Sequence, residues 1–313
     1  MTTTPGLAVT PEPIMTVAAG FMAAKHFFAA SELGLFEALA DAPAALPALA
    51  CRTGLTPRAA RISADATVAL GLLERHGDSY HNSPAADRFL AGRPQPDLRP
   101  LLRFWDRISY PAWQDLAGSL GRGPRREIFE LDDAMQEMAL AGIEAVLAGP
   151  AAALAHGYDF DAHDRLLDVG GGTGSWSVAA VRAHPRLTAT VVELPVVAAV
   201  ARARVAEAGL DERVAVVADD AMHGELPAGH DVVLVANLVH YWSPEQNRQL
   251  LRRIRAAATP DAHLLLADLW TDSTHTSPAH AALMAGEFAV HLENGDVYPQ
   301  SLVVATADQP SRR

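Results

Sequence analysis

The stretch Leu166–Gly174 reads LLDVGGGTG and decides the fold of this chain. An apolar run ends in an acidic residue and passes directly into a loop with four glycines in five positions. Because glycine has no Cβ, such a loop lets a ligand approach the backbone closely. Gly170, Gly172 and Gly174 fit G-x-G-x-G, but Ser175 stands where the dinucleotide fingerprint G-x-G-x-x-G needs its third glycine. The stretch therefore predicts a strand and a ligand-binding turn without that fingerprint.

A second acidic residue ends the next predicted strand, Ala189–Glu193. Glu193 follows the glycine loop by about 20 positions, the spacing at which a carboxylate usually holds the ribose of a nucleoside. A glycine-rich turn alone indicates little. A strand, Asp168, the turn, a helix and a second strand ending in Glu193 form a much more specific set, which predicts a nucleoside site at two neighbouring strand ends.

Strands and helices alternate over residues 161–313, which predicts an α/β domain with a mostly parallel sheet. The predicted strands are Arg165–Val169, Ala189–Glu193, Val214–Ala218, Asp231–Ala236 and His263–Leu269. The predicted helices are Ser175–Ala183, Val196–Ala208, Pro244–Ala258 and Ser277–His291. Ligands of such sheets bind at the carboxyl ends of the strands. The polar residues expected at those ends are Asp168, Glu193, Asp219, Asp220, Asn237, His240 and Asp268.

The first half of the chain is predicted to be helical, behind a Thr- and Pro-rich disordered tail at residues 1–13. Residues 14–100 show the order of a winged-helix-like domain, with Thr56 and Pro57 as a helix-start pair. Its expected segments are Ile14–Ala30, Leu33–Ala40, Leu46–Gly54, Thr56–Leu73 and a hairpin around Gly77–Ser83. Residues 101–160 are expected to form a helical connector that ends with a helix over Asp132–Ala148. The aromatics Phe104, Trp105, Tyr110 and Trp113 either line a small-molecule pocket or pack in the core.

Composition argues against several classes of partner. The net charge of −12 makes nucleic acid and anionic membranes poor candidates. Residues 41–100 contain seven Arg against six Asp and Glu, so a packing or dimerisation module is favoured over a DNA-binding one. Ile14–Ala30 is apolar but interrupted by Lys25 and His26, which favours a subunit-interface helix, or a core helix, over a membrane span. With Cys51 as the lone cysteine and no signal peptide expected, the chain is predicted to be cytoplasmic.

Three motifs carry a resemblance to a known family: Leu167–Gly174, Val192–Pro195 (VELP) and Val239–Ser243 (VHYWS). From about residue 14 to 298 the chain resembles the class I S-adenosylmethionine-dependent methyltransferases, specifically the two-domain small-molecule O-methyltransferases. The resemblance implies a winged-helix-like dimerisation domain, a Rossmann-like catalytic domain and a homodimer. It also implies S-adenosylmethionine as cofactor and a small-molecule acceptor, such as a hydroxyl of a secondary metabolite.

The resemblance further implies which residues hold the cofactor. Glu193 would take the ribose hydroxyls, since a carboxylate accepts two vicinal hydroxyl protons well. Asp220 would reach the adenine amino group and Met222 would pack on the ring, although neighbouring Asp219 could take the place of Asp220. The glycines would let the backbone meet the methionyl part. The full set is Asp168, Gly170, Gly172, Gly174, Glu193, Asp220 and Met222.

His240 is implied to be the general base. Methyl transfer from a sulfonium mainly requires alignment of the partners. A hydroxyl acceptor must also lose its proton, and an ordinary His pKa near 6.5 suits that task. In related plant enzymes two acidic residues flank this histidine, and Asp268 and Asp296 match them here. The alternative is a helix-capping or core histidine.

Two departures from the family stand out. The family usually has Asp directly after the histidine, where this chain has Tyr241. The family's contacts to the acceptor are therefore not expected to be the same in this chain. The resemblance also implies a C-terminal helix and a sixth strand that are not expected here, while Ser301–Thr306 resembles the seventh strand. That strand would then be an exposed edge.

Two other functions are compatible with the sequence. His240 and His291, with a carboxylate such as Asp296, could hold a divalent metal for carbon methylation of an α-keto acid. His291 is otherwise a cation at a helix C-terminus. The chain could also be a non-catalytic regulator that keeps the fold. The other histidines are expected to be structural or at the surface, although His275 and His280 could touch an acceptor.

Overall fold

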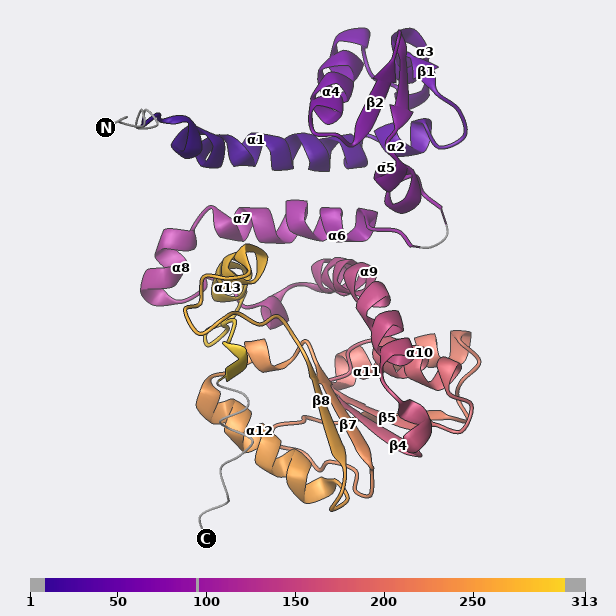
Figure 1. Cartoon of the computed structure of the whole chain (residues 1–313), viewed down its shortest axis with the longest axis vertical. Coiled ribbons are helices and arrows are strands. Elements are labelled where there is room, and N and C mark those ends of the chain that lie inside the picture. The colour runs from indigo at the N-terminus through magenta and orange to yellow at the C-terminus, as the bar shows by residue number, and fades with distance from the viewer. Residues whose placement is uncertain (1–8, 94–95, 302–313) are drawn as a thin grey trace, which may run out of the picture. The chain divides into compact units, whose positions relative to one another are not determined.

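Figure 1 shows a computed structural model of the protein, in which the structure describes residues 9–93 and 96–301. The chain forms two compact units that divide after Asp106. One unit is helical with a small antiparallel sheet, and the other carries a parallel sheet between helices. The predicted fold class is confirmed.

The N-terminal unit has the predicted winged-helix-like order. Its helices are α1 (Glu12–Glu32), α2 (Leu35–Ala38), α3 (Leu46–Thr53), α4 (Pro57–Ala69), α5 (Pro84–Phe89) and α6 (Arg99–Phe104). Its strands β1 (Ala44–Ala45), β2 (Leu73–His76) and β3 (Ser79–Asn82) pair antiparallel in the order β1-β3-β2. The wing is therefore the β2–β3 hairpin.

Helix α4 begins where the sequence predicts and ends earlier. The hydroxyl of Thr56 accepts a hydrogen bond from the backbone N–H of Ala59 at 3.2 Å, and Pro57 takes the first helical position. The predicted end at Leu73 was wrong. Gly71 has φ +72°, which ends a helix, and Leu73 already belongs to β2.

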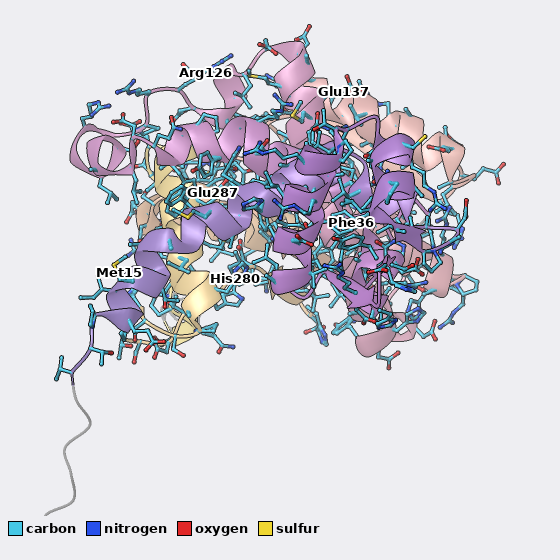
Figure 2. All side chains as sticks on the ribbon, turned by 90° about the horizontal axis from the view of Figure 1, so that it is seen from above. Met15, Phe36, Arg126, Glu137, His280 and Glu287 are labelled. Atoms are coloured by element: carbon cyan, nitrogen blue, oxygen red, sulfur yellow. The ribbon has the colours of Figure 1, made fainter. Side chains whose placement is uncertain are left out.

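Helix α1 leaves its first half uncovered within its own unit. Ile14 is 72% exposed and Val17 82%, and Met15, labelled in Figure 2, is also exposed. Phe36 on α2, labelled in the same view, is fully buried. Burial within its own unit therefore does not explain the apolar start of α1. By length and composition α1 and α9 (Asp133–Gly157) could each cross a membrane, a test that core helices also pass.

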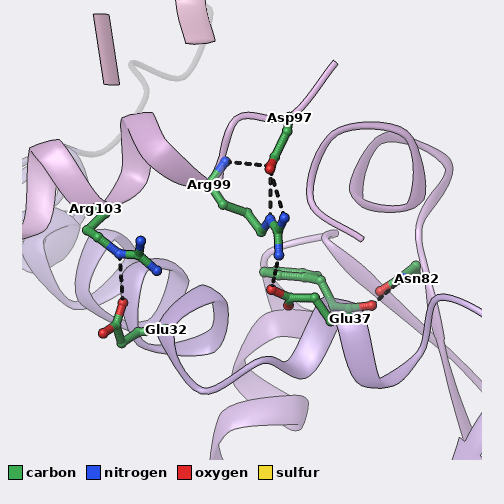
Figure 3. Close-up of polar contacts among 7 residues, drawn as sticks. Glu32, Glu37, Asn82, Asp97, Arg99 and Arg103 are labelled. Atoms are coloured by element: carbon green, nitrogen blue, oxygen red, sulfur yellow. Dashed lines mark hydrogen bonds and ion pairs between the residues drawn. The ribbon is translucent and has the colours of Figure 1, made fainter. Parts of the chain in front are cut away.

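Ion pairs hold α6 within the N-terminal unit (Figure 3). Arg103 pairs with Glu32 at the end of α1 over 3.5 Å. Arg99 pairs with Asp97 over 2.8 Å and also with Glu37 of α2. Asn82 donates to the backbone carbonyl of Phe36 over 2.9 Å and ties β3 to α2. These contacts fix the last helix of the unit.

The second unit begins with short helices and continues as an alternating α/β domain. η1 (Trp105–Ser109) runs across the division and is followed by α7 (Tyr110–Trp113), α8 (Leu116–Arg122), η2 (Ile128–Glu130), α9 and η3 (Phe160–Ala162). The strands are β4 (Arg165–Val169), β5 (Thr188–Glu193), β6 (Val214–Ala218), β7 (Val232–Ala236) and β8 (His263–Ala267). The remaining helices are α10 (Ser175–Ala183), α11 (Pro195–Glu207), η4 (Val239–Tyr241), α12 (Pro244–Ala257) and α13 (Ala279–His291).

The five strands pair in parallel in the order β6-β5-β4-β7-β8 within the described residues. Side chains alternate between the two faces, as the period of two requires. Leu166 and Val191 pack toward α9 and α10, whereas Leu167 and Val192 pack into a second core that includes Leu250 and Ile254 of α12. Because the strands are parallel, their carboxyl ends meet at one edge, and this edge positions the site.

Several predicted boundaries need correction. The helix expected to end at Ala148 continues through Pro150 to Gly157, because Ala151 and Ala155 are buried against the rest of the domain. The last strand ends at Ala267 rather than Leu269, and α13 begins at Ala279 rather than Ser277. The last named element within the described residues is α13. The strand predicted over Ser301–Thr306 lies, apart from its first residue, outside them.

Candidate functional site

The glycine loop requires glycine at three of its positions for conformational reasons. Gly170, Gly172 and Gly174 have φ of +63°, +57° and +81°, a region that other residues rarely adopt. A Cβ on Gly170 would lie 2.6 Å from a methyl carbon of Leu238. A Cβ on Gly172 would meet nothing within 4 Å, because this residue faces open space. The loop therefore presents bare backbone to a cavity.

Asp168 lies beneath this loop and has no exposed surface. It accepts a hydrogen bond from the Ser177 hydroxyl at 2.7 Å. Burial raises the pKa of the Asp168 carboxyl to about 6, the nearby charge of Glu193 adds to this, and the Ser177 hydrogen bond opposes it. A Cβ on Gly171 would lie 2.6 Å from the Asp168 carboxyl carbon. Asp168 thus supports the loop from below and is not part of the cavity wall.

Glu193 joins the end of β5 to the glycine loop. Its carboxylate accepts the backbone N–H of Gly172 at 2.8 Å and that of Leu194 at 2.7 Å. Burial raises the pKa of the Glu193 carboxyl, and these two hydrogen bonds oppose the rise. The structure therefore brings Glu193 to the glycine loop, as the spacing of about 20 residues predicts.

Asp219 and Asp220 have different partners. Both carboxylate oxygens of Asp219 accept backbone N–H groups, from Asp220 at 2.8 Å and from Glu225 at 3.0 Å. Asp220 accepts the backbone N–H of Met222 and contacts the imidazole of His223, each at 2.7 Å. Burial works to raise the pKa of Asp220, but His223 and the Met222 N–H outweigh it and hold the pKa low. Asp219 shapes the turn, so Asp220 is the better placed to exchange a partner for a ligand.

A cavity of about 590 Å³ adjoins these groups. Its walls come from the glycine loop, the ends of β5 and β7, residues 219–223, η4, and the connector between Ile128 and Leu147. Phe129 and Tyr241 are among the lining residues, whereas the four connector aromatics named from the sequence are not. Residues predicted from the sequence that line the cavity are Gly170, Gly172, Glu193, Asp219, Asp220, Met222 and Asn237.

His240 and Asp268 form a buried pair next to this cavity. Nδ1 of His240 lies 2.8 Å from a carboxylate oxygen of Asp268, which also accepts the backbone N–H of Leu269. A carboxylate can only accept, so the neutral ring carries its proton on Nδ1 and keeps a lone pair on Nε2. The structure thus brings together two of the three residues predicted for catalysis.

Four rings form a column through His240. The His240 ring stacks on Phe288 of α13, with centroids 3.9 Å apart, and on Tyr241 at 4.7 Å. Tyr241 in turn lies 5.6 Å from Phe129 of η2. Sequence analysis missed Phe129 and Phe288 because no local pattern links such distant positions.

Asp296 touches the same turn through its backbone. Its N–H donates to the carbonyl of His240 at 3.0 Å, while its carboxylate is exposed and accepts the N–H of Val297 at 2.7 Å. No contact between the Asp296 carboxylate and the imidazole of His240 is found among the described residues. Asp296 therefore holds the backbone of the histidine instead of its ring.

His291 belongs to a separate buried cluster on α13, where Figure 2 labels Glu287. Its Nε2 lies 3.3 Å from the Glu287 carboxylate, which also accepts hydrogen bonds from Ser109 and Trp113. Burial works to raise the pKa of Glu287, but His291 and the two donors outweigh it and hold the pKa low. His275 and His280 are exposed.

The predicted metal pair has a different arrangement in the structure, because His240 and His291 are each held by their own carboxylate. Among residues 9–93 and 96–301, no group of three His, Cys, Asp or Glu side chains is placed to hold a metal ion. A second missed cluster lies at the glycine loop, where Glu144 of α9 accepts the hydroxyls of Thr173 and Ser175 and pairs with Arg204.

Comparison with known proteins places this geometry in context. Residues 126–301 match the O-methyltransferase domain family, and residues 15–92 match the O-methyltransferase dimerisation domain. The chain is 34% identical over 290 residues to 3-hydroxy-5-methyl-1-naphthoate 3-O-methyltransferase of Streptomyces sahachiroi, covering 90% of this chain and 84% of that protein. It is 33% identical over 296 residues to the tetracenomycin polyketide synthesis 8-O-methyl transferase TcmO of Streptomyces glaucescens, covering 92% and 87%. Its structure is similar to that of the S-adenosylmethionine-dependent methyltransferase SibL in its apo form, with a TM-score of 0.80 and 32% identity over 95% of this chain and 92% of that chain.

Proposed function

Because the chain belongs to the O-methyltransferase family and is thus an S-adenosylmethionine-dependent methyltransferase, we propose that it methylates a hydroxyl group of a small secondary metabolite. The observation that carries this proposal is the His240–Asp268 pair beside the cavity. When bound, S-adenosylmethionine supplies an electrophilic methyl group. The residues of this chain have to align the acceptor and remove its proton.

His240 is proposed to be the general base. Asp268 fixes the ring with its proton on Nδ1, so Nε2 is the nitrogen that can accept the proton of an acceptor hydroxyl. The stacked rings of Phe288 and Tyr241 prevent the imidazole from tilting. We propose that Asp296 acts only by holding the His240 carbonyl.

The cavity residues fit the proposed cofactor. Gly172 offers bare backbone next to open space, where the methionyl part would pass. Glu193 would exchange its hydrogen bond from Gly172 for the ribose hydroxyls, and Asp220 would exchange His223 for the adenine amino group. Met222 would pack on the purine face. We propose a supporting role for Asp168, and a pocket-forming role for the 101–160 connector.

We further propose that the enzyme is a cytoplasmic homodimer. The dimerisation domain matches residues 15–92, and the apolar first half of α1 needs a partner surface. Carbon methylation with a metal is less well supported, because the two candidate histidines are each engaged by a carboxylate. A non-catalytic regulator is also less well supported, because the His240–Asp268 pair and the glycine loop are both present.

The test is release of S-adenosylhomocysteine from S-adenosylmethionine in the presence of a panel of naphthols and hydroxybenzoates. We expect turnover with at least one hydroxylated aromatic, unchanged by EDTA. Turnover that is lost with EDTA and restored by a divalent ion would instead support the metal-dependent reaction. Binding of S-adenosylhomocysteine without any turnover would contradict the proposed acceptor class.

A further inference from the structure

Tyr241 is the departure from the family motif that the proposed mechanism does not use. It follows His240 directly and lines the cavity, at a place where the family resemblance implies Asp. An aspartate can only accept hydrogen bonds at neutral pH, whereas a phenol can donate one. The exchange therefore replaces an acceptor by a donor next to His240.

The Tyr241 side chain is held on a fixed turn. Asn247 donates to the carbonyls of Val239 at 2.8 Å and Trp242 at 3.0 Å, and Tyr298 also donates to the Trp242 carbonyl. The backbone N–H of Asp296 donates to the carbonyl of His240 in the same turn. With this backbone anchored on both sides, the ring of Tyr241 has a preorganised position.

The hydroxyl of Tyr241 remains available to a ligand. Within the described residues it has no hydrogen-bond partner, although the ring itself packs between His240 and Phe129. Burial raises the pKa of Tyr241 to about 12, and the charges of Glu193 and Asp268 add to this. The hydroxyl therefore keeps its proton throughout the physiological range and acts as a neutral donor.

We propose, on the basis of the function proposed above, that Tyr241 is a specificity-determining residue that selects a flat aromatic acceptor with a carbonyl oxygen next to the hydroxyl to be methylated. The Tyr241 hydroxyl donates to that carbonyl oxygen. Phe129, which is 56% exposed, provides a further aromatic surface for the acceptor ring. The carboxylates of Glu193 and Asp268 disfavour an acceptor that carries a negative charge at this place.

The test compares binding of two uncharged naphthols to the protein saturated with S-adenosylhomocysteine. Methyl 3-hydroxy-2-naphthoate has a carbonyl next to its hydroxyl, and 2-naphthol does not. We expect the wild type to bind the ester about tenfold more tightly, the effect of one buried hydrogen bond. Tyr241→Phe should remove this preference and leave the affinity for S-adenosylhomocysteine unchanged. Tyr241→Asp should shift preference toward 2,3-dihydroxynaphthalene, whose second hydroxyl donates.

Tyr298→Phe is the matched control, since it removes a nearby hydroxyl that does not line the cavity, while Asn247 still donates to the Trp242 carbonyl and holds the turn. It should lower the thermal midpoint and keep the preference for the ester. Equal binding of the two naphthols by the wild type, or binding of neither, overturns the proposal. So does an equal loss of both in Tyr241→Phe, which would mean a purely structural ring. Binding with the expected preference but without turnover would contradict only the proposed reaction.

Discussion

One half of the site is formed mainly by backbone groups and the other by side chains. The backbone half is made of the glycine loop and the Glu193 carboxylate, within the strand–helix–strand unit from β4 to β5. The half around His240 is made of side chains, with Phe129, Tyr241, His240 and Phe288 drawn from the connector, η4 and α13. A backbone site depends on dihedral angles that only glycine adopts easily, whereas a side-chain site changes with each substitution. Substitutions should therefore be poorly tolerated in the first half, whereas in the second half they should alter which acceptor binds.

The largest expected effect is in the backbone half. Gly172→Val places a β-branched side chain at φ +57° and directs it into the cavity. We expect at least about 100-fold weaker binding of S-adenosylhomocysteine by calorimetric titration. Gly209→Val is the control, because Gly209 has a similar φ of +67°, also faces open space, and lies outside the cavity wall. If both variants lose binding equally, general strain is the cause and the loop has no special role.

The next effect is on turnover rather than on cofactor binding, and is expected when His240 is removed. His240→Ala should lower kcat by about 10²–10⁴-fold, the usual range for loss of a general base. The affinity for S-adenosylhomocysteine should stay within about twofold, because His240 does not line the cavity. Added imidazole should restore part of the turnover in the space left by the ring. Near-wild-type kcat in His240→Ala would mean that the acceptor ionises without this residue.

The contrast between the two halves also explains what the sequence could predict. The sheet, the glycine loop and the approach of Glu193 to it follow from patterns within about 30 residues, and the structure agrees with them. The family resemblance was confirmed, and with it the cofactor. The His240–Asp268 contact joins residues 28 positions apart and was predicted only through that resemblance.

Contacts of longer range could not be predicted from the sequence. Phe129 meets Tyr241 across more than 100 positions, and Glu287 meets Ser109 across 178, through packing of helices that no local period reports. The helix predicted to end at Ala148 continues through Pro150 because tertiary packing outweighed the local signal. Asp296 was predicted to flank His240 with its carboxylate. Its backbone N–H contacts the His240 carbonyl, but its side chain is exposed.

Asp268→Asn should have a more modest effect on turnover. Asparagine can still accept from Nδ1 of His240, but it carries no charge to stabilise the imidazolium, and its amide can turn to donate instead. Partners that orient a histidine typically contribute about 10–100-fold, and we expect a kcat decrease in that range. A decrease as large as that of His240→Ala would indicate that the ring has lost its orientation.

A different kind of effect, on stability rather than turnover, arises from Asp168 beneath the glycine loop. Its carboxyl has a pKa of about 6 in the folded protein against an ordinary 3.8, so the folded state binds the proton more strongly. The stability contributed by this group is fully present below about pH 4 and is lost as pH rises through 6. This gap corresponds to at most ~3 kcal/mol. Asp168→Asn should remove that loss and raise the urea midpoint at pH 7.5 relative to wild type, with little change at pH 4.

Asp231→Asn, directly before β7, should change the pH dependence of stability in the opposite direction. Burial works to raise the pKa of Asp231, but the backbone N–H groups of Asp164 and Arg165, which donate to it over 2.9 and 2.8 Å, hold it below the usual value. Its contribution is present above about pH 4 and is lost as pH falls, so the variant should be less stable at pH 7.5. If Asp168→Asn also destabilised the protein at pH 7.5, the ionised carboxylate would be supporting the loop. The backbone half of the site would then depend on a side-chain charge as much as the half around His240 does.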